Sequence, residues 1–216
     1  MRPALGLIII FVSLIPGCAT APLPPAADLD PVWQARQAAL MSVTAWHIRG
    51  RLAVRAADQG GHATLNWKRD GERHRMDFTG PLGRGHLRLT QDSRGAELRD
   101  ADKRVWRAAD AGRLLYRATG WIVPLDGMNY WVLGLPAPGP TPERQLDGQG
   151  RLKRLTQSGW DIQFLEYTRH GAFDLPSKMY ITRQDRSPEA SPATGETLEV
   201  RLSIENWILK GVRSEE

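Results

Sequence analysis

The chain has 216 residues, and its 29 basic and 24 acidic residues give a formal net charge of +5. A mildly basic chain with both signs interspersed allows attraction to an anionic membrane surface or an acidic partner. The single cysteine excludes an intrachain disulfide, so packing alone must hold the core.

Residues 1–17 are typical of a secretory signal peptide: Arg2 supplies a positive charge, and residues 5–15 form an apolar run too short to span a membrane. The sequence Ile15-Pro16-Gly17-Cys18 resembles a bacterial lipobox, which predicts cleavage before Cys18 and acylation of its thiol, although Pro16 departs from the usual pattern. The alternative is an ordinary secretory signal followed by an incidental thiol, but a lone cysteine in an oxidising compartment favours lipidation. Ala19 is not the Asp associated with inner-membrane retention, so we expect an outer-membrane lipoprotein facing the periplasm. Such a protein is not expected to bind nucleic acid.

Cleavage would leave 199 of the 216 residues. Residues 18–29 are rich in Pro and Ala and predict a flexible tether, and residues 30–216 have the length of a single domain. Asp30-Pro31 predicts a helix start, with Asp30 as N-cap and Pro31 at the first helical position. This helix is expected to end near Thr44. Its predicted apolar stripe consists of Trp33, Leu40 and Val43.

From Trp46 onward, apolar and polar residues alternate, which predicts an antiparallel meander. Asp70-Gly71 is a hairpin signal, and Arg94-Gly95 is another turn. The expected strands lie near residues 46–55, 63–68, 73–79, 86–90, 96–99 and 103–106.

The break between two of these strands, Gly80-Pro81-Leu82-Gly83, predicts a hairpin tip, because Pro pre-sets a turn angle and Gly permits conformations that other residues resist. Leu82 is unusual there, since a large apolar residue at a tip has little to pack against. Either it folds down onto a neighbour, or it contacts something apolar outside the protein.

The middle of the chain predicts two helices, at 109–119 and 126–133, with Gly120 as the C-terminal cap of the first. Residues 136–142 are expected to form a loop, and residues 187–195 a polar loop. Further strands are expected at 152–157, 160–167, 179–183 and 198–207.

Helices inserted between two sets of antiparallel strands indicate a mainly β (α+β) fold, and they allow a strongly curved sheet with helices across its concave side. Such a sheet encloses either a filled core or a hydrophobic cavity able to hold a lipid chain, and the patterning is compatible with both.

No catalytic or metal-binding grouping is evident. The five histidines lack metal-ligand spacing, no serine lies in a Gly-x-Ser-x-Gly elbow, and Gly80–Gly85 lacks the lysine of a phosphate-binding loop. We therefore expect a protein that is not an enzyme and needs no cofactor or metal.

Several residue sets together resemble the LolB family of outer-membrane lipoprotein receptors, part of the lipoprotein localization factors. They extend from Cys18 to Trp207, and their order and spacing make the resemblance more specific than any one of them. The matching sets are the lipobox, Trp33, Arg49-Gly50, Trp67, Pro81-Leu82-Gly83, Trp131–Pro136, Gln157-Ser-Gly-Trp160, Leu175-Pro176 and Asn206-Trp207.

The resemblance implies an open, incomplete antiparallel β-barrel covered by a few helices, with a hydrophobic cavity for acyl chains. It also implies a monomer that accepts acylated lipoproteins from the periplasmic carrier LolA into this cavity and inserts them into the inner leaflet of the outer membrane, without nucleotide hydrolysis. It places Leu82, flanked by Pro81 and Gly83, in a protruding membrane-insertion loop. The expected cavity residues are Leu65, Trp67, Met76, Phe78, Leu87, Leu89, Leu114, Leu115, Met128, Trp131, Leu133 and Trp160. Trp106 and Trp121 are interpreted as core anchors.

Two other functions remain open: a lipid- or ligand-binding envelope lipoprotein, and a structural subunit of an envelope assembly. Arg49, Arg51 and Arg55 would suit docking on an acidic carrier, although solvated strand faces have the same pattern.

Overall fold

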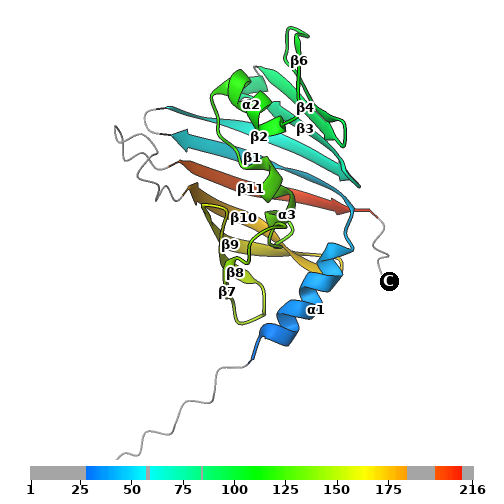
Figure 1. The fold of residues 1–216 in the computed structure, drawn as a ribbon, viewed down its shortest axis with the longest axis vertical. Helices are drawn as coiled ribbons and strands as arrows, with labels where there is room; N and C mark the ends of the chain where they lie inside the picture. The colour runs from blue at the N-terminus through cyan, green and yellow to red at the C-terminus, as the bar shows by residue number, and fades with distance from the viewer. Residues whose placement is uncertain (1–27, 57–58, 84, 184–197, 211–216) are drawn as a thin grey trace, which may run out of the picture.

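The computed structural model describes residues 28–56, 59–83, 85–183 and 198–210 (Figure 1). The predicted signal peptide, Cys18, most of the predicted tether and the predicted polar loop at 187–195 lie outside the described residues. The side chain of Leu82 also lies outside them, so its exposure stays a prediction.

Eleven antiparallel strands form one open sheet in the order β6-β5-β4-β3-β2-β1-β11-β10-β9-β8-β7. Strands β6 and β7 are the two edges and do not pair with each other, so the barrel is incomplete, which confirms the predicted fold class (Figure 1). The strands are β1 (Ala45–Ala56), β2 (Gln59–Asp70), β3 (Arg73–Thr79), β4 (His86–Asp92), β5 (Gly95–Arg99), β6 (Val105–Ala108), β7 (Glu143–Leu146), β8 (Leu152–Gln157), β9 (Trp160–His170), β10 (Phe173–Arg183) and β11 (Glu199–Leu209).

In the part of the chain that the structure describes, three α-helices accompany the sheet: α1 (Asp30–Met41), α2 (Ala111–Thr119) and α3 (Leu125–Trp131). A short 3-10 turn, η1, covers Pro81–Gly83. Helices α2 and α3 cross one face of the sheet, and α1 lies near the end of β1 (Figure 1). We call the opposite face of the sheet the outer face. Within the described ranges, no helix has both the length and the apolar content required to cross a bilayer.

The first and last strands pair with each other at the centre of the sheet. Between Arg49 and Gly50 the register with β11 shifts, so that β11 carries one extra residue, Glu205. A Cβ atom at Gly50 would overlap the backbone oxygen of Ser203. Glycine is therefore required at this register shift, where a side chain on β1 would meet the backbone of β11.

The core lies between the helices and the sheet. Strand residues alternate between this core and the outer face, as the period of two predicts. One row of paired residues crosses five strands from the centre to the edge region, and each of its members is at most 1% exposed. The row consists of Ile48, Trp67, Met76, Leu89 and Leu98.

Several predicted boundaries are wrong for local reasons. Helix α1 ends at Met41 rather than near Thr44, and its N-cap is Leu29 rather than Asp30; the Asp28 side chain instead accepts a hydrogen bond from the Asp30 backbone N–H at 3.0 Å. Strand β6 begins at Val105, two residues later than predicted, because Lys103 adopts a left-handed turn conformation with φ of 65°.

Further predictions need correction. Helix α3 covers 125–131 instead of 126–133, and β9 and β10 are both longer than predicted. Strand β7 was not predicted at all, because its sequence Glu-Arg-Gln-Leu has no alternation of apolar residues. Trp106 is not a core anchor: it is 39% exposed on the edge strand β6, with the Arg104 guanidinium 5.6 Å from the centre of its ring.

Candidate functional site

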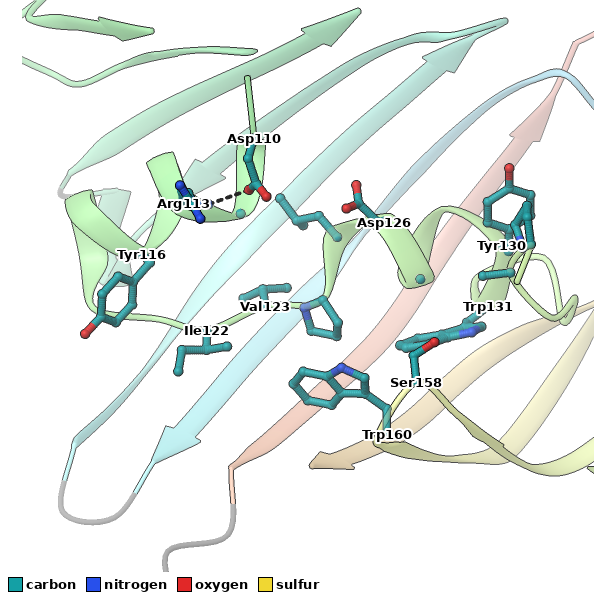
Figure 2. Close-up of a pocket in the computed structure, with 16 residues that line it drawn as sticks. Asp110, Arg113, Tyr116, Ile122, Val123, Asp126, Tyr130, Trp131, Ser158 and Trp160 are labelled. Carbon is teal, nitrogen blue, oxygen red and sulfur yellow. Dashed lines mark hydrogen bonds between the residues drawn. The ribbon is translucent and has the colours of Figure 1, made fainter. Parts of the chain in front are cut away.

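A pocket of about 560 Å³ lies between the α2–α3 region and the turn that joins β8 to β9 (Figure 2). Its apolar part comes from the connector between the helices and from the aromatic rings of Tyr116, Tyr130, Trp131 and Trp160. Tyr116 and Ile122 are 53% and 40% exposed, so the pocket opens to solvent along an apolar border. The connector contributes Ile122, Val123, Pro124 and Leu125.

Two caps position helix α2 beside the pocket. At its start, Asp110 accepts a hydrogen bond from the Arg113 backbone N–H at 2.7 Å, which satisfies one of the free donors of the first turn. At its end, Gly120 adopts a left-handed conformation with φ of 72°, and its N–H donates to the Tyr116 carbonyl at 2.7 Å. The cap that the sequence predicted at Gly120 therefore turns the chain into the apolar connector.

Two glycines make room for the tryptophans that hold the connector and α3. A Cβ atom at Gly61 on β2 would overlap the ring of Trp121, and a Cβ atom at Gly127 would overlap the ring of Trp131 on the same helix. Both rings therefore lie directly against backbone. This close packing fixes the connector to the sheet and fixes the indole that forms one wall of the pocket.

A buried amide joins α3 to the sheet. The Gln157 side-chain oxygen accepts hydrogen bonds from Trp131 Nε1 at 3.1 Å and from the Ala137 N–H at 2.9 Å, and its nitrogen donates to the Ala137 carbonyl at 2.7 Å. Gln157 is 4% exposed. Because a buried amide is favourable only when it is hydrogen-bonded, these three bonds define where the segment after α3 lies on β8.

The polar residues around the pocket do not form a catalytic arrangement. The Asp110 carboxylate caps α2, and Arg113, Asp126 and Ser158 lie apart around the lining (Figure 2). Across the described ranges, no cluster of three or more His, Cys, Asp or Glu side chains has metal-binding geometry. The volume falls within the range of about 300–1,000 Å³ typical of ligand pockets, so the site is suited to non-covalent binding of an apolar group.

The predicted cavity residues belong to one apolar cluster. Trp131 and Trp160 line the pocket, and Leu87 and Trp160 are only partly buried against the cluster. The other predicted residues are at most 3% exposed and do not line this pocket, and their contact with lipid stays a prediction. They are Leu65, Trp67, Met76, Phe78, Leu89, Leu114, Leu115, Met128 and Leu133.

The sequence reasoning missed the connector as pocket lining. Its sequence, Ile-Val-Pro-Leu, is a run of apolar residues between two helices where a polar loop would be expected. That run was the available signal for an apolar surface.

A second aromatic group supports the sheet at the other end of the strands. Trp46 makes edge-to-face contacts with Trp67 at 5.0 Å and with Trp207 at 5.6 Å, measured between ring centres. Trp67 Nε1 donates a hydrogen bond to His74 Nδ1 at 3.3 Å, which requires that nitrogen to be unprotonated. Burial, with a smaller contribution from the nearby positive charge of Arg69, lowers the pKa of His74 to about 4.

An open sheet with helices across one face and an apolar pocket beneath them defines a class of protein suited to non-covalent binding of an apolar ligand. The family model "Outer membrane lipoprotein LolB" matches residues 44–207, more than half of the chain. The chain therefore belongs to the LolB family of outer-membrane lipoproteins, a non-enzymatic family, which confirms the expected family and the expectation that the protein is not an enzyme.

Curated relatives agree with this assignment. An outer-membrane lipoprotein LolB from Nitrosococcus oceani is 35% identical over 207 residues, covering 95% of this chain and 97% of the relative. A relative of the same name from Alkalilimnicola ehrlichii is 34% identical, covering 91% of this chain and 92% of the relative. Another from Pseudomonas putida is also 34% identical, covering 81% of this chain and 80% of the relative.

We expect Gln157→Leu to lower the free energy of unfolding by about 1–3 kcal/mol, because the buried Trp131 N–H and the Ala137 backbone lose their partner. Urea denaturation followed by tryptophan fluorescence measures the change. Gln149→Leu is the matched control: its side chain accepts one exposed hydrogen bond from Arg151. Equal effects of the two variants would contradict the assigned role of Gln157.

Stability is also expected to depend on the protonation of His74. An unfolded histidine has a pKa of about 6.5. Because the folded pKa is lower, at about 4, the unfolded state binds the proton more tightly between these values. The contribution of His74 is therefore fully present above about pH 6.5 and is lost as the pH falls toward 4.

His74→Gln should flatten the melting-temperature profile between pH 7 and pH 4 while keeping an oxygen acceptor for Trp67. Differential scanning calorimetry of this variant, of the wild type and of the outer-face control His62→Gln measures the difference. If all three profiles run parallel, burial of His74 does not contribute to the pH dependence.

Proposed function

We propose that this protein receives acylated lipoproteins from the periplasmic carrier LolA and inserts them into the inner leaflet of the outer membrane, with Cys18 as its own lipid anchor. Membership of the LolB family supports the general role, a receptor in lipoprotein localization. The observation that carries the finer proposal is the apolar pocket of about 560 Å³, bordered by the exposed Ile122 and Tyr116.

The physics of the cargo explains why such a pocket is useful. Exposing an acyl chain to water costs about 0.8 kcal/mol per CH₂ group, so a chain must pass between two proteins without leaving an apolar environment. Transfer therefore requires the carrier and the receptor to place their apolar sites against each other. It proceeds toward the receiver with the higher affinity for the chain, because only differential affinity shifts such an equilibrium. The bilayer is the better apolar solvent, so discharge needs no nucleotide.

The hairpin tip between β3 and β4 is our candidate for the membrane-insertion loop. The Gly80 N–H donates to the Gly85 carbonyl at 3.0 Å, and the Gly83 N–H donates to the Gly80 carbonyl at 3.2 Å. Pro81 and Gly83 are exposed, and Gly83 adopts a φ of 74°. These bonds close a compact tip. We propose that the Leu82 side chain at this tip enters lipid.

Receipt of cargo can be measured with the mature chain carrying Cys18→Ala, mixed with LolA loaded with a triacylated lipoprotein. We expect the cargo to move to this protein, and Ile122→Glu to reduce the transfer because a carboxylate is then placed beside the pocket. Met41→Glu, at a 68% exposed residue outside the pocket, is the matched control. If the protein without a pocket substitution receives no lipoprotein, the receptor proposal fails. Copurification with free lipid alone would then favour a lipid-binding lipoprotein, and copurification with other envelope proteins alone would favour a structural subunit of an envelope assembly.

Delivery can be separated from receipt with Leu82→Glu. Transfer from LolA should remain, while delivery into liposomes should fall about tenfold or more, because a charge within a bilayer costs about 2.5–3.5 kcal/mol. Leu82→Ile is the control and should deliver normally. A fall of the melting temperature by many degrees in Leu82→Glu would show that the side chain is part of the core and would contradict the insertion role.

A further inference from the structure

The outer face of the sheet carries a groove of about 960 Å³ that the proposed transfer does not use. It crosses the strands β2, β1, β11, β10 and β9. The residue pairing between these strands sets two adjacent rows of side chains across it. The first row is Thr64, Arg51, Ser203 and Lys178; the second is His62, Ala53, Arg201, Tyr180 and Gln163.

A β-bulge adds an apolar residue to this groove. The pairing of β9 with β10 passes from Glu166 opposite Lys178 directly to Phe164 opposite Met179, so Leu165 has no partner. The bulge interrupts the alternation: Phe164 is buried, and both Leu165 and Glu166 are exposed. Bulges commonly re-aim a side chain in this way. Leu165 is 52% exposed, and it lines the groove together with Ala53 and Tyr180.

The charged residues that line the groove are all basic: Arg51, Lys178 and Arg201, with no Asp or Glu among the described lining residues. Their acidic partners stand outside the lining. Arg51 pairs with Glu205, Lys178 with Glu166, and Arg201 with Glu199.

Two of these ion pairs, those of Arg51 and Lys178, are open to competition, whereas Glu199 beside Arg201 is only 21% exposed. The side chains of Arg51 and Glu205 are 77% and 53% exposed, and those of Lys178 and Glu166 are 51% and 60% exposed. Exposed pairs of this kind contribute little to stability, so a ligand anion can take over one of the cations at small cost. The aliphatic stems of Arg51, Lys178 and Arg201 also extend the apolar surface around Ala53 and Leu165.

We propose that this groove binds a single-chain anionic phospholipid, with the alkyl chain along Leu165, Ala53 and Tyr180 and the phosphate among Arg51, Lys178 and Arg201. The lining combines apolar surface with cations whose carboxylate partners lie outside it, and a phosphate that displaces an exposed carboxylate favours an anionic amphiphile over a neutral one. The groove volume lies at the upper end of the usual range for ligand pockets, about 300–1,000 Å³. The site is on the opposite face of the sheet from the pocket beneath the helices, and its occupancy does not depend on transfer from LolA.

The test measures binding of lysophosphatidylglycerol with a 12-carbon chain, below its micellar concentration, to the mature chain carrying Cys18→Ala. Isothermal titration calorimetry supplies the affinity, and lysophosphatidylcholine of the same chain length supplies the neutral comparison. We expect the anionic lipid to bind about tenfold or more tightly than the zwitterionic one, which corresponds to about 1.4 kcal/mol.

Two pairs of variants locate the site. Leu165→Glu should weaken binding at least tenfold, while Ile208→Glu, a 49% exposed residue on β11 outside the groove lining, should not change it. Arg201→Ala should weaken binding of the anionic lipid, while Arg99→Ala, which removes the same charge on β5, should not. Circular dichroism confirms that each variant is folded.

The proposal is overturned if the two lipids bind equally, if neither binds, or if Leu165→Glu binds as tightly as Ile208→Glu. It is also overturned if Ile122→Glu, in the pocket beneath the helices, abolishes binding while Leu165→Glu does not. Because neither LolA nor lipoprotein is present, these outcomes leave the proposed transfer function unaffected.

Discussion

The pairing of β1 with β11 is the contact on which the rest of the structure depends. It joins the β1–β6 meander to the β7–β11 strands, and it brings residues 46–55 against residues 199–209. Every other pair of neighbouring strands in this sheet is consecutive along the chain. The central pair must therefore offset the entropy of closing most of the chain into a loop. Because Gly50 has no side chain, the backbone of β1 can lie close to the backbone of Ser203 on β11.

The helices are held over the sheet by a small number of specific contacts. Trp121 lies against the backbone of Gly61, Trp131 lies against Gly127, and Gln157 connects Trp131 to β8. The first of these contacts precedes the connector, and the other two follow it. Ile122 is consequently left 40% exposed, although it is apolar. The packing thus leaves Ile122 as an accessible apolar surface, while Val123 and Leu125 in the same connector are buried.

Local sequence signals predicted most of the fold. The alternation in β1–β5, the strand at 152–157 and the cap at Gly120 are each determined by neighbouring residues, and each prediction is confirmed. Strand β7 depends on its partner β8 instead, since its own residues Glu143–Leu146 carry no strand pattern. The bulge at Leu165 could not be predicted from the sequence either, because only the register with β10 reveals it.

The candidate site was less predictable than the fold. Apolar strand residues such as Trp67 and Met76 were predicted to face the core side, and they do, but the same pattern describes cavity lining and filled core. The choice between them depends on where the helices lie, and that is set by contacts between residues far apart in sequence, such as Gln157 with Ala137. Trp106 shows the converse: its size suggested burial, yet its position on an edge strand leaves it exposed beside Arg104.

The two unpaired edge strands of the sheet have a consequence for a protein that is crowded on a membrane surface. A protein attached to a membrane diffuses in two dimensions, where copies meet often and in similar orientations. An unpaired strand is a template for polymerisation, and β6 and β7 are each only four residues long. They carry Arg107 on one border and Glu143 and Arg144 on the other. Because these edge strands are short and charged, the barrel can remain open around its apolar interior. Copies of the protein do not then join edge to edge into fibres.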